Sequence, residues 1–132
     1  MLSVPAINEK ATIQRARHFF KYDFQKLRAL SLSRYRLGSG VPSLVAVAGG
    51  RQDTTERAQV AGVDADNIMK EVANVLDAMQ PDYKKILELK YFNELSLAVI
   101  CERLGYSHAT VYVKLNQALL EFGLISGLAV IE

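Results

Sequence analysis

The chain has 132 residues, half of them hydrophobic, and its 16 basic and 14 acidic side chains leave a net charge of +2. This length suits one small domain with an appendage, and a single cysteine excludes an internal disulfide and favours the reducing cytoplasm. The N-terminus lacks a signal-peptide pattern, and the apolar segment 119–131 is shorter than the ~20 residues of a membrane span. We therefore expect no membrane partner.

Basic side chains are concentrated in the first part of the chain. Residues 1–50 hold eight basic and two acidic side chains, whereas residues 51–132 hold eight basic and twelve acidic ones. A positively charged segment joined to a slightly acidic remainder indicates a polyanionic partner for the basic part.

Residues 8–31 are predicted to form one amphipathic helix. Its apolar side chains recur at three- and four-residue steps, and they are Ile13, Ala16, Phe20, Phe24, Leu27 and Leu30. We interpret this helix as a packing element, or as one that forms a homodimer, with a solvated basic flank. A DNA-contacting arm is the alternative, and Arg15, Lys21 and Arg28 are then candidate phosphate contacts.

A linker follows this helix, because glycine, serine and proline cluster in Gly38-Ser39-Gly40-Val41-Pro42-Ser43. The predicted division of the chain is a basic N-terminal helical arm (1–37), a linker (38–55) and a helical domain (56–132). Within the domain we predict one helix over 64–79 and another that begins at Pro81 and ends near Phe92.

The most specific pattern begins at Ser96, which can cap a helix whose apolar residues share one face. Gly105 is expected to end that helix, because glycine readily adopts the left-handed conformation. Ser107 can cap a second helix, which we expect to end at Gly123. A helix, a glycine turn and a second helix at this spacing are typical of the DNA-binding helix-turn-helix.

The second helix supplies most of the candidate DNA-binding residues. Its predicted buried stripe consists of Val111, Leu115, Ala118 and Phe122. On the other faces, amides can bond adenine, methyl groups can contact the thymine methyl, and polar groups at the helix start can bind phosphate. The predicted DNA-binding residues are Arg103, Ser107, His108, Thr110, Tyr112, Val113, Lys114, Asn116 and Gln117. Lys84 and Lys85 on the preceding helix are further candidate phosphate contacts.

A protein-binding role is the competing interpretation of this helix. Helix-turn-helix geometry also occurs in proteins that bind no DNA, and the second helix has one cation, Lys114. Phosphate neutralisation supplies most non-specific DNA affinity, and exposed Val113 and Leu120 suit a protein contact. We favour DNA binding because the motif is complete in order, spacing and caps.

The sequence has no recognisable catalytic or cofactor pattern. His18 and His108 lie far apart without neighbouring ligands, and Cys101 on an apolar helix face is interpreted as a small buried residue. Neither a phosphate-binding glycine loop nor a nucleophile elbow is present. We therefore expect no enzymatic activity, no metal site and no cofactor.

The C-terminal part of the chain resembles region four of the primary sigma factors. The similar segments are Tyr83-Lys84-Lys85-Ile86-Leu87-Glu88-Leu89-Lys90-Tyr91-Phe92, Ile100-Cys101-Glu102-Arg103-Leu104-Gly105-Tyr106-Ser107 and Ala118-Leu119. The Gly-Tyr-Ser turn, the ending Ala118-Leu119-Leu120-Glu121-Phe122 and the basic N-terminal helix are also similar to the ArpU/RinA-type phage regulators of late transcription. The resemblance is specific over about 64–122 and loose over 8–63.

The resemblance implies an all-α fold that ends in a sigma-region-four-like helix-turn-helix. It further implies a sequence-specific regulator of a phage or prophage late operon, most simply an activator, in a bacterial host cell. Double-stranded DNA and RNA polymerase are the implied partners. Sigma-type sequences often carry arginine at the positions of His108, Thr110 and Tyr112, so the base preference does not transfer. A phage DNA-packaging (terminase) small subunit and a sigma-like protein-interaction module remain as alternatives.

Overall fold

The computed structural model describes residues 3–38 and 52–131, with side chains described over 3–33 and 64–131. Across these residues the fold is all-α, as predicted. The elements are α1 (Glu9–His18), η1 (Phe19–Asp23), α2 (Phe24–Gly38), α4 (Gln52–Ala78), α5 (Pro81–Leu87), η2 (Glu88–Phe92), α6 (Leu97–Leu104) and α7 (His108–Ser126), where η marks a π-helical turn. No strand is present in these two ranges, and Ile7 and Ile131 form an isolated antiparallel bridge.

The N-terminal helix is confirmed and is longer than predicted, because helical structure continues to Gly38. Asn8 caps its start, with the side-chain oxygen accepting a hydrogen bond from the Ala11 N–H at 3.0 Å. The π-helical turn η1 separates α1 from α2. A π-turn adds one residue to the helical turn and so changes which side chains face the core after it.

The chain forms two compact units, and they differ from the predicted arm, linker and domain. One unit comprises Met1–Lys21 with Ala73–Glu132, and the other comprises Tyr22–Val72. The reason is that α1 packs on α7, so the first helix is part of the C-terminal unit. Of the predicted linker, residues 39–51 lie outside the described residues, and residues 52–55 begin α4.

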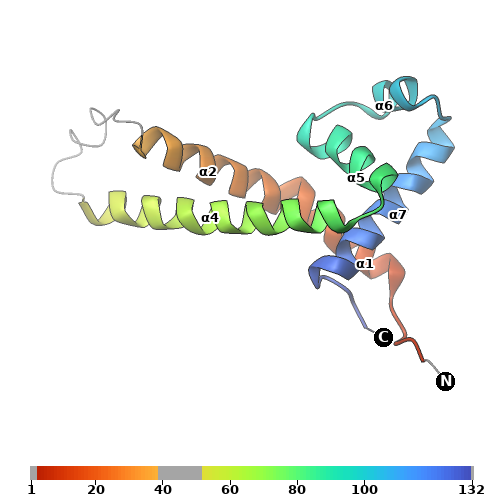
Figure 1. Ribbon diagram of the computed structural model, residues 1–132, viewed down its shortest axis with the longest axis horizontal. Helices are drawn as coiled ribbons and strands as arrows, with labels where there is room; N and C mark the ends of the chain where they lie inside the picture. The colour runs from red at the N-terminus through yellow and green to blue at the C-terminus, as the bar shows by residue number, and fades with distance from the viewer. Residues whose placement is uncertain (1–2, 39–51, 132) are drawn as a thin grey trace. The chain divides into compact units, whose positions relative to one another are not determined.

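In the unit Tyr22–Val72, α2 and the first part of α4 lie side by side (Figure 1). The Ser31 hydroxyl on α2 donates a hydrogen bond to the Asp66 carboxylate on α4. Phe24 and Ala65 are buried. The helix predicted over 64–79 is therefore the second half of a longer helix, α4.

The other unit is built around α7, against which α1, α5 and α6 pack (Figure 1). An aromatic cluster joins the first helical segment to the rest of this unit. The Phe20 ring stacks on Tyr91 of η2 at a centroid distance of 4.9 Å and lies 4.5 Å from Phe122 of α7. Phe19 stacks on the same Phe122 ring at 5.8 Å. Phe20 and Phe122 are almost wholly inaccessible to solvent, so this cluster is the centre of the core.

The prediction that Gly123 ends the last helix is wrong. The helix α7 continues to Ser126, and Gly127 ends it in the left-handed conformation, with φ of 87°. Gly123 is buried, and a Cβ at this position would lie 2.6 Å from the Thr12 Cγ2 on α1. Glycine therefore serves here as the point where two helices approach closely.

The segment after α7 is held against the start of α1. The Val130 N–H donates to the Thr12 hydroxyl at 3.0 Å, and its carbonyl accepts from the Asn8 N–H at 2.8 Å. The buried Thr12 hydroxyl in turn donates to the Asn8 carbonyl at 2.8 Å, so its polar group is satisfied. Across residues 3–38 and 52–131, we find no helix with the length and apolar character to cross a membrane.

Candidate nucleic-acid interface

The predicted helix-turn-helix is confirmed as α6, a glycine turn and α7. The Ser96 hydroxyl caps α6 by accepting a hydrogen bond from the Val99 N–H at 3.3 Å, and the Ser107 hydroxyl caps α7 through the Thr110 N–H at 3.2 Å. Between them, Gly105 has φ of 73° and donates its N–H to the Cys101 carbonyl at 2.8 Å. A residue with a Cβ is strained in this left-handed conformation, which explains the glycine.

Packing fixes the rotation of α7 about its own axis. The stripe predicted to be buried is confirmed, because Val111, Leu115, Ala118 and Phe122 are each at most 5% exposed. Helix α6 packs on α7 and presents the buried Ile100 and Cys101. The side chains on the other faces of α7 are thereby directed away from the core.

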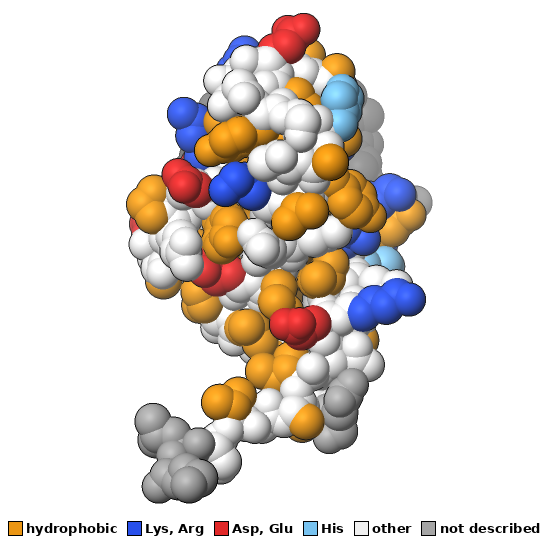
Figure 2. Space-filling model, turned by 90° about the vertical axis from the view of Figure 1, so that its right-hand side faces the viewer, with side chains coloured by type: hydrophobic (Ala, Val, Ile, Leu, Met, Phe, Trp, Pro, Cys, Tyr) orange, Lys and Arg blue, Asp and Glu red, His pale blue; other side chains and the backbone are white. Residues whose placement is uncertain are grey.

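The first two turns of α7 form an exposed surface, which we call the recognition face. Its members are Ser107, His108, Ala109, Thr110, Tyr112 and Val113. Tyr112 is 54% exposed and Val113 is 53% exposed. Figure 2 shows the molecule from the side of α6 and the start of α7, where hydrophobic side chains lie between scattered Lys, Arg, Asp and Glu. This surface is therefore mixed and carries little charge of its own.

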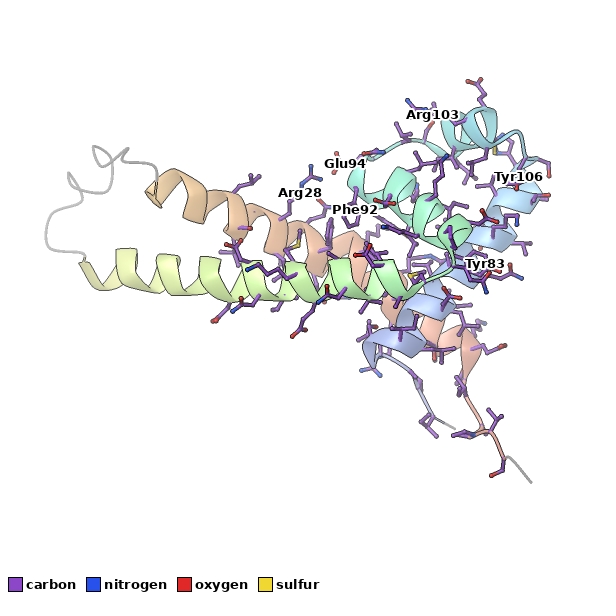
Figure 3. All side chains as sticks on the ribbon, in the orientation of Figure 1. Arg28, Tyr83, Phe92, Glu94, Arg103 and Tyr106 are labelled. Carbon is purple, nitrogen blue, oxygen red and sulfur yellow. The ribbon has the colours of Figure 1, made fainter. Side chains whose placement is uncertain are left out.

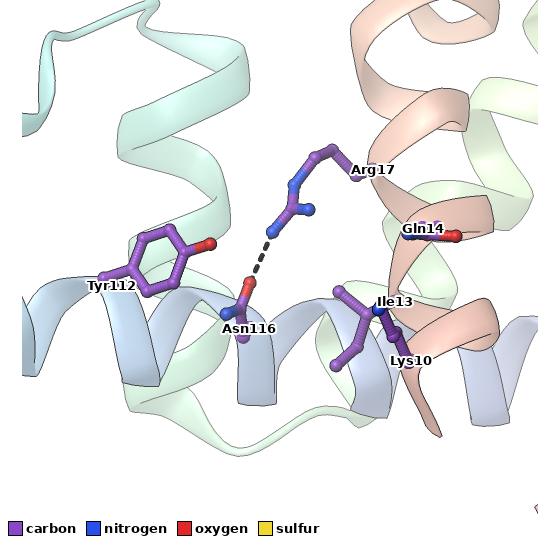
Figure 4. Close-up of a pocket in the computed structure, with 6 residues that line it drawn as sticks. All are labelled: Lys10, Ile13, Gln14, Arg17, Tyr112 and Asn116. Carbon is purple, nitrogen blue, oxygen red and sulfur yellow. Dashed lines mark hydrogen bonds between the residues drawn. The ribbon is translucent and has the colours of Figure 1, made fainter. Parts of the chain in front are cut away.

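Asn116 and Gln117, the two predicted base-reading amides, have hydrogen-bond partners within the chain. The Asn116 oxygen accepts from the Arg17 guanidinium of α1 (Figure 4), and the Gln117 oxygen accepts from the Tyr83 hydroxyl of α5 at 2.8 Å. A guanidinium only donates hydrogen bonds, so the NH2 group of Asn116 points away from Arg17. A two-bond contact with adenine would require Asn116 to leave Arg17.

Arg17 also lies beside Tyr91 in the same unit. Burial raises the pKa of the Tyr91 phenol above its ordinary value of 10.0, and this outweighs the charge and hydrogen bond of Arg17, which act to lower it. Arg17 therefore joins α1 to η2 as well as to α7.

The cations of the helix-turn-helix are few. Residues 96–126 contain two basic side chains, Arg103 and Lys114, and two acidic ones. Arg103 is exposed on α6, and Tyr106 lies in the turn that follows (Figure 3). The Lys114 ammonium lies 5.2 Å from the centre of the Tyr106 ring. Such a cation–π contact holds the lysine near the start of α7.

The candidate phosphate contacts lie on several elements. Lys85 is exposed on α5, whereas the neighbouring Lys84 forms an ion pair with Asp77 at 2.6 Å. The hydrogen bond and charge of Asp77 raise the pKa of Lys84 above its usual value. Arg15 and Lys21 are exposed in the same unit, whereas Arg28 belongs to the unit Tyr22–Val72. The structure thus brings Lys85, Arg15 and Lys21, but not Arg28, into the unit of the recognition face.

Lys10 and Arg17 belong to the basic flank of the first helix and are not among the candidate phosphate contacts predicted from the sequence, yet the structure places both beside α7. With Ile13 and Gln14 of α1, they line a cavity that Tyr112 and Asn116 border from α7 (Figure 4). The available signal was their spacing, because residues seven apart lie on one side of a helix. Which helix that side faces could not be read from spacing.

Loss of the Ser107 cap is expected to destabilise the unit that contains the recognition face. Ser107→Ala should lower the free energy of unfolding by about 1 kcal/mol, because the Thr110 N–H loses its side-chain acceptor. Ser107→Asp should keep the stability, since aspartate is an equally good cap. Urea denaturation followed by circular dichroism measures both variants, and equal losses would contradict the capping role.

Comparison with known families also identifies the region of the chain that contains the helix-turn-helix. Residues 69–122 match the family model described as "Sigma-70, region 4", a helix-turn-helix DNA-binding domain. The match spans α5, η2, α6, most of α7 and the end of α4, and it leaves α1 outside. No curated protein matches the chain, and no solved structure does.

Proposed function

We propose that the chain is a sequence-specific DNA-binding regulator of transcription, in which the start of α7 enters the major groove. The observation that carries the proposal is the complete helix-turn-helix, with two serine caps, a left-handed glycine turn and an exposed recognition face, inside the segment that matches sigma-70 region 4. In this geometry the N-terminal residues of the second helix meet the base edges.

The recognition face suits apolar contacts with bases. The Val113 methyl groups and the Thr110 methyl group can contact the thymine methyl, and the exposed Tyr112 can add a ring contact. Asn116 contributes its NH2 group, which can donate to a base acceptor or a phosphate oxygen while Arg17 keeps the amide oxygen.

The regulatory role that we propose is activation of a phage or prophage late operon in the cytoplasm of a bacterial host. The similarity of the whole layout to the ArpU/RinA-type regulators supports this context. Contact with RNA polymerase is part of the proposal, since the matched segment is a unit of sigma factors. The buried face of α1 contacts α7 of its own chain, so a homodimer would use other surfaces of the N-terminal helix.

Binding can be tested without knowledge of the operator. Rounds of selection from a randomised duplex library yield a preferred sequence, and fluorescence anisotropy then compares this duplex with a scrambled one at low and moderate salt. Preference for the selected duplex is expected. Equal affinity for both duplexes at every salt concentration would contradict the proposal.

Val113→Asp is expected to weaken binding to the selected duplex at least about tenfold, because it replaces an apolar contact with a negative charge facing DNA. Leu124→Asp is the matched control, since Leu124 is 42% exposed on the last turns of the same helix. Anisotropy titrations measure both variants after circular dichroism has verified folding. Equal losses for the two variants would show that α7 does not bind through its start.

A second function, a protein-interaction module that binds no DNA, is favoured by one observation. The recognition face has few charges and an exposed Tyr112 and Val113. Transcription in vitro with bacterial RNA polymerase separates the two functions. The regulator should increase transcription from a promoter that carries the selected sequence and should have no effect without it, whereas the module would act regardless of that sequence.

A further inference from the structure

An open cleft lies between α1 and α7, with a volume of about 410 Å³ (Figure 4). The side chains that line it are Lys10, Ile13, Gln14, Arg17, Tyr112 and Asn116. The described residues that line the cleft include two cations, Lys10 and Arg17, and no acidic side chain. Small-molecule sites are lined mainly by hydrophobic and aromatic side chains, whereas five of the six side chains here carry a polar or charged group. The lining therefore fits a hydrated anion.

The hydrogen-bonding groups around the cleft are suited to phosphate. Lys10 and Arg17 lie two helical turns apart on one side of α1, and they face Tyr112 and Asn116, which lie one turn apart on α7. Arg17 has five N–H groups, so it can donate to a phosphate oxygen while it still donates to Asn116. The Asn116 NH2 group and the Tyr112 hydroxyl are further donors. A phosphate group offers only acceptors, which matches this set.

The cleft is also next to the recognition face, because Tyr112 belongs to both. A helix in the major groove has a sugar–phosphate backbone on each side, since the groove is only about 12 Å wide. A cleft that opens beside the second turn of α7 would therefore lie along the path of one strand if this helix entered the groove. The helix-turn-helix itself has Arg103 and Lys114 as its cations, so the neighbouring α1 supplies positive charge that α7 lacks.

We propose that this cleft is a phosphate-binding site, in which Lys10 and Arg17 of α1 hold the DNA strand that flanks the groove entered by α7. The inference rests on the proposed function and adds a helix outside the matched segment to the DNA interface. The ligand is one phosphodiester of duplex DNA with its attached sugar.

Lys10→Gln is the main test, because Lys10 is exposed and its loss leaves the core intact. Anisotropy with the selected duplex over a series of salt concentrations gives the slope of log affinity against log salt. The variant should bind severalfold more weakly, and its slope should fall in magnitude by about 1, the value expected for one lost phosphate contact. Arg17→Gln should cause a similar fall in slope, and its stability is measured alongside because it also contacts Asn116.

Lys90→Gln is the matched control in the same unit. Lys90 lies on η2, carries the same charge as Lys10 and does not line the cleft. Its slope should equal that of the unmodified protein. An equal fall in slope for Lys10→Gln and Lys90→Gln would overturn the cleft as the phosphate site, in favour of general attraction by the cations of this unit.

Neutral methylphosphonates at single positions of the duplex locate the phosphate. A methylphosphonate at one position should weaken DNA binding by the unmodified protein. It should have little further effect on binding by Lys10→Gln, because the partner charge is already gone. Additive losses at every position would overturn the proposal.

Two further outcomes separate the cleft from the proposed function. Loss of DNA binding in Val113→Asp, together with an unchanged salt slope in Lys10→Gln, would overturn the proposed phosphate site. It would still agree with the proposed DNA-binding function. Titration with inorganic phosphate, monitored by NMR of the Asn116 and Gln14 side-chain amides, tests whether the cleft binds a free anion. Saturation at low millimolar phosphate with no effect of Lys10→Gln on DNA affinity would overturn the DNA strand as the ligand.

Discussion

Phe20→Ala is expected to lower the free energy of unfolding by about 3–5 kcal/mol, a large part of the 5–15 kcal/mol typical of a small domain. The Phe20 side chain is fully buried and contacts the rings of Tyr91 and Phe122, so its removal leaves a cavity where α1, η2 and α7 meet. Urea denaturation followed by circular dichroism and by tyrosine fluorescence measures the loss.

Tyr112→Ala is the control for this prediction. It removes an aromatic ring of similar size that is 54% exposed, and it should change stability by no more than about 0.5 kcal/mol. A loss below 1 kcal/mol for Phe20→Ala would mean that the first helix is a separate arm in solution.

Gly123→Ala is expected to lower the free energy of unfolding by about 1–3 kcal/mol, although the same change within an ordinary helix stabilises by up to about 1 kcal/mol. The sign is reversed because the new Cβ would lie 2.6 Å from the Thr12 Cγ2. Thr12 is branched at Cβ and its hydroxyl is held by two hydrogen bonds, so its methyl group cannot easily move.

Thr12→Ser provides the partner variant, because it deletes the methyl group and keeps the hydroxyl. In the Thr12→Ser background, Gly123→Ala should be neutral or stabilising by up to about 1 kcal/mol. Denaturation of the two single variants and the double variant gives the coupling energy. Additive losses in the double variant would contradict a direct contact between Thr12 and residue 123.

The helix-turn-helix could be predicted from the sequence because its signals are local. Ser96 and Ser107 cap the helices that follow them, and Gly105 has the left-handed conformation that only glycine adopts without strain. The buried stripe of α7 follows from the helical period alone. Each of these features depends on residues within a few positions of one another.

The packing of α1 on α7 could not be predicted, because it depends on residues about 100 positions apart. A glycine near the end of an apolar helical pattern is ordinarily a stop signal, and the opposing Thr12 that gives Gly123 its other role is not adjacent in sequence. The sequence indicates that Asn116 can form hydrogen bonds with a base. The hydrogen bond that Arg17 donates to Asn116 could not be predicted, because it depends on the same long-range packing.

The interlocking of the two ends of this unit also sets the order of its assembly during synthesis. The ribosome makes α1 first, and the partner surface on α7 emerges only after most of the chain has been translated. Until then the apolar stripe of α1 has no surface to cover it, and closing so long a loop is slow. A nascent chain that stalls before α7 therefore lacks the Phe122 ring against which Phe20 of η1 packs in the finished unit.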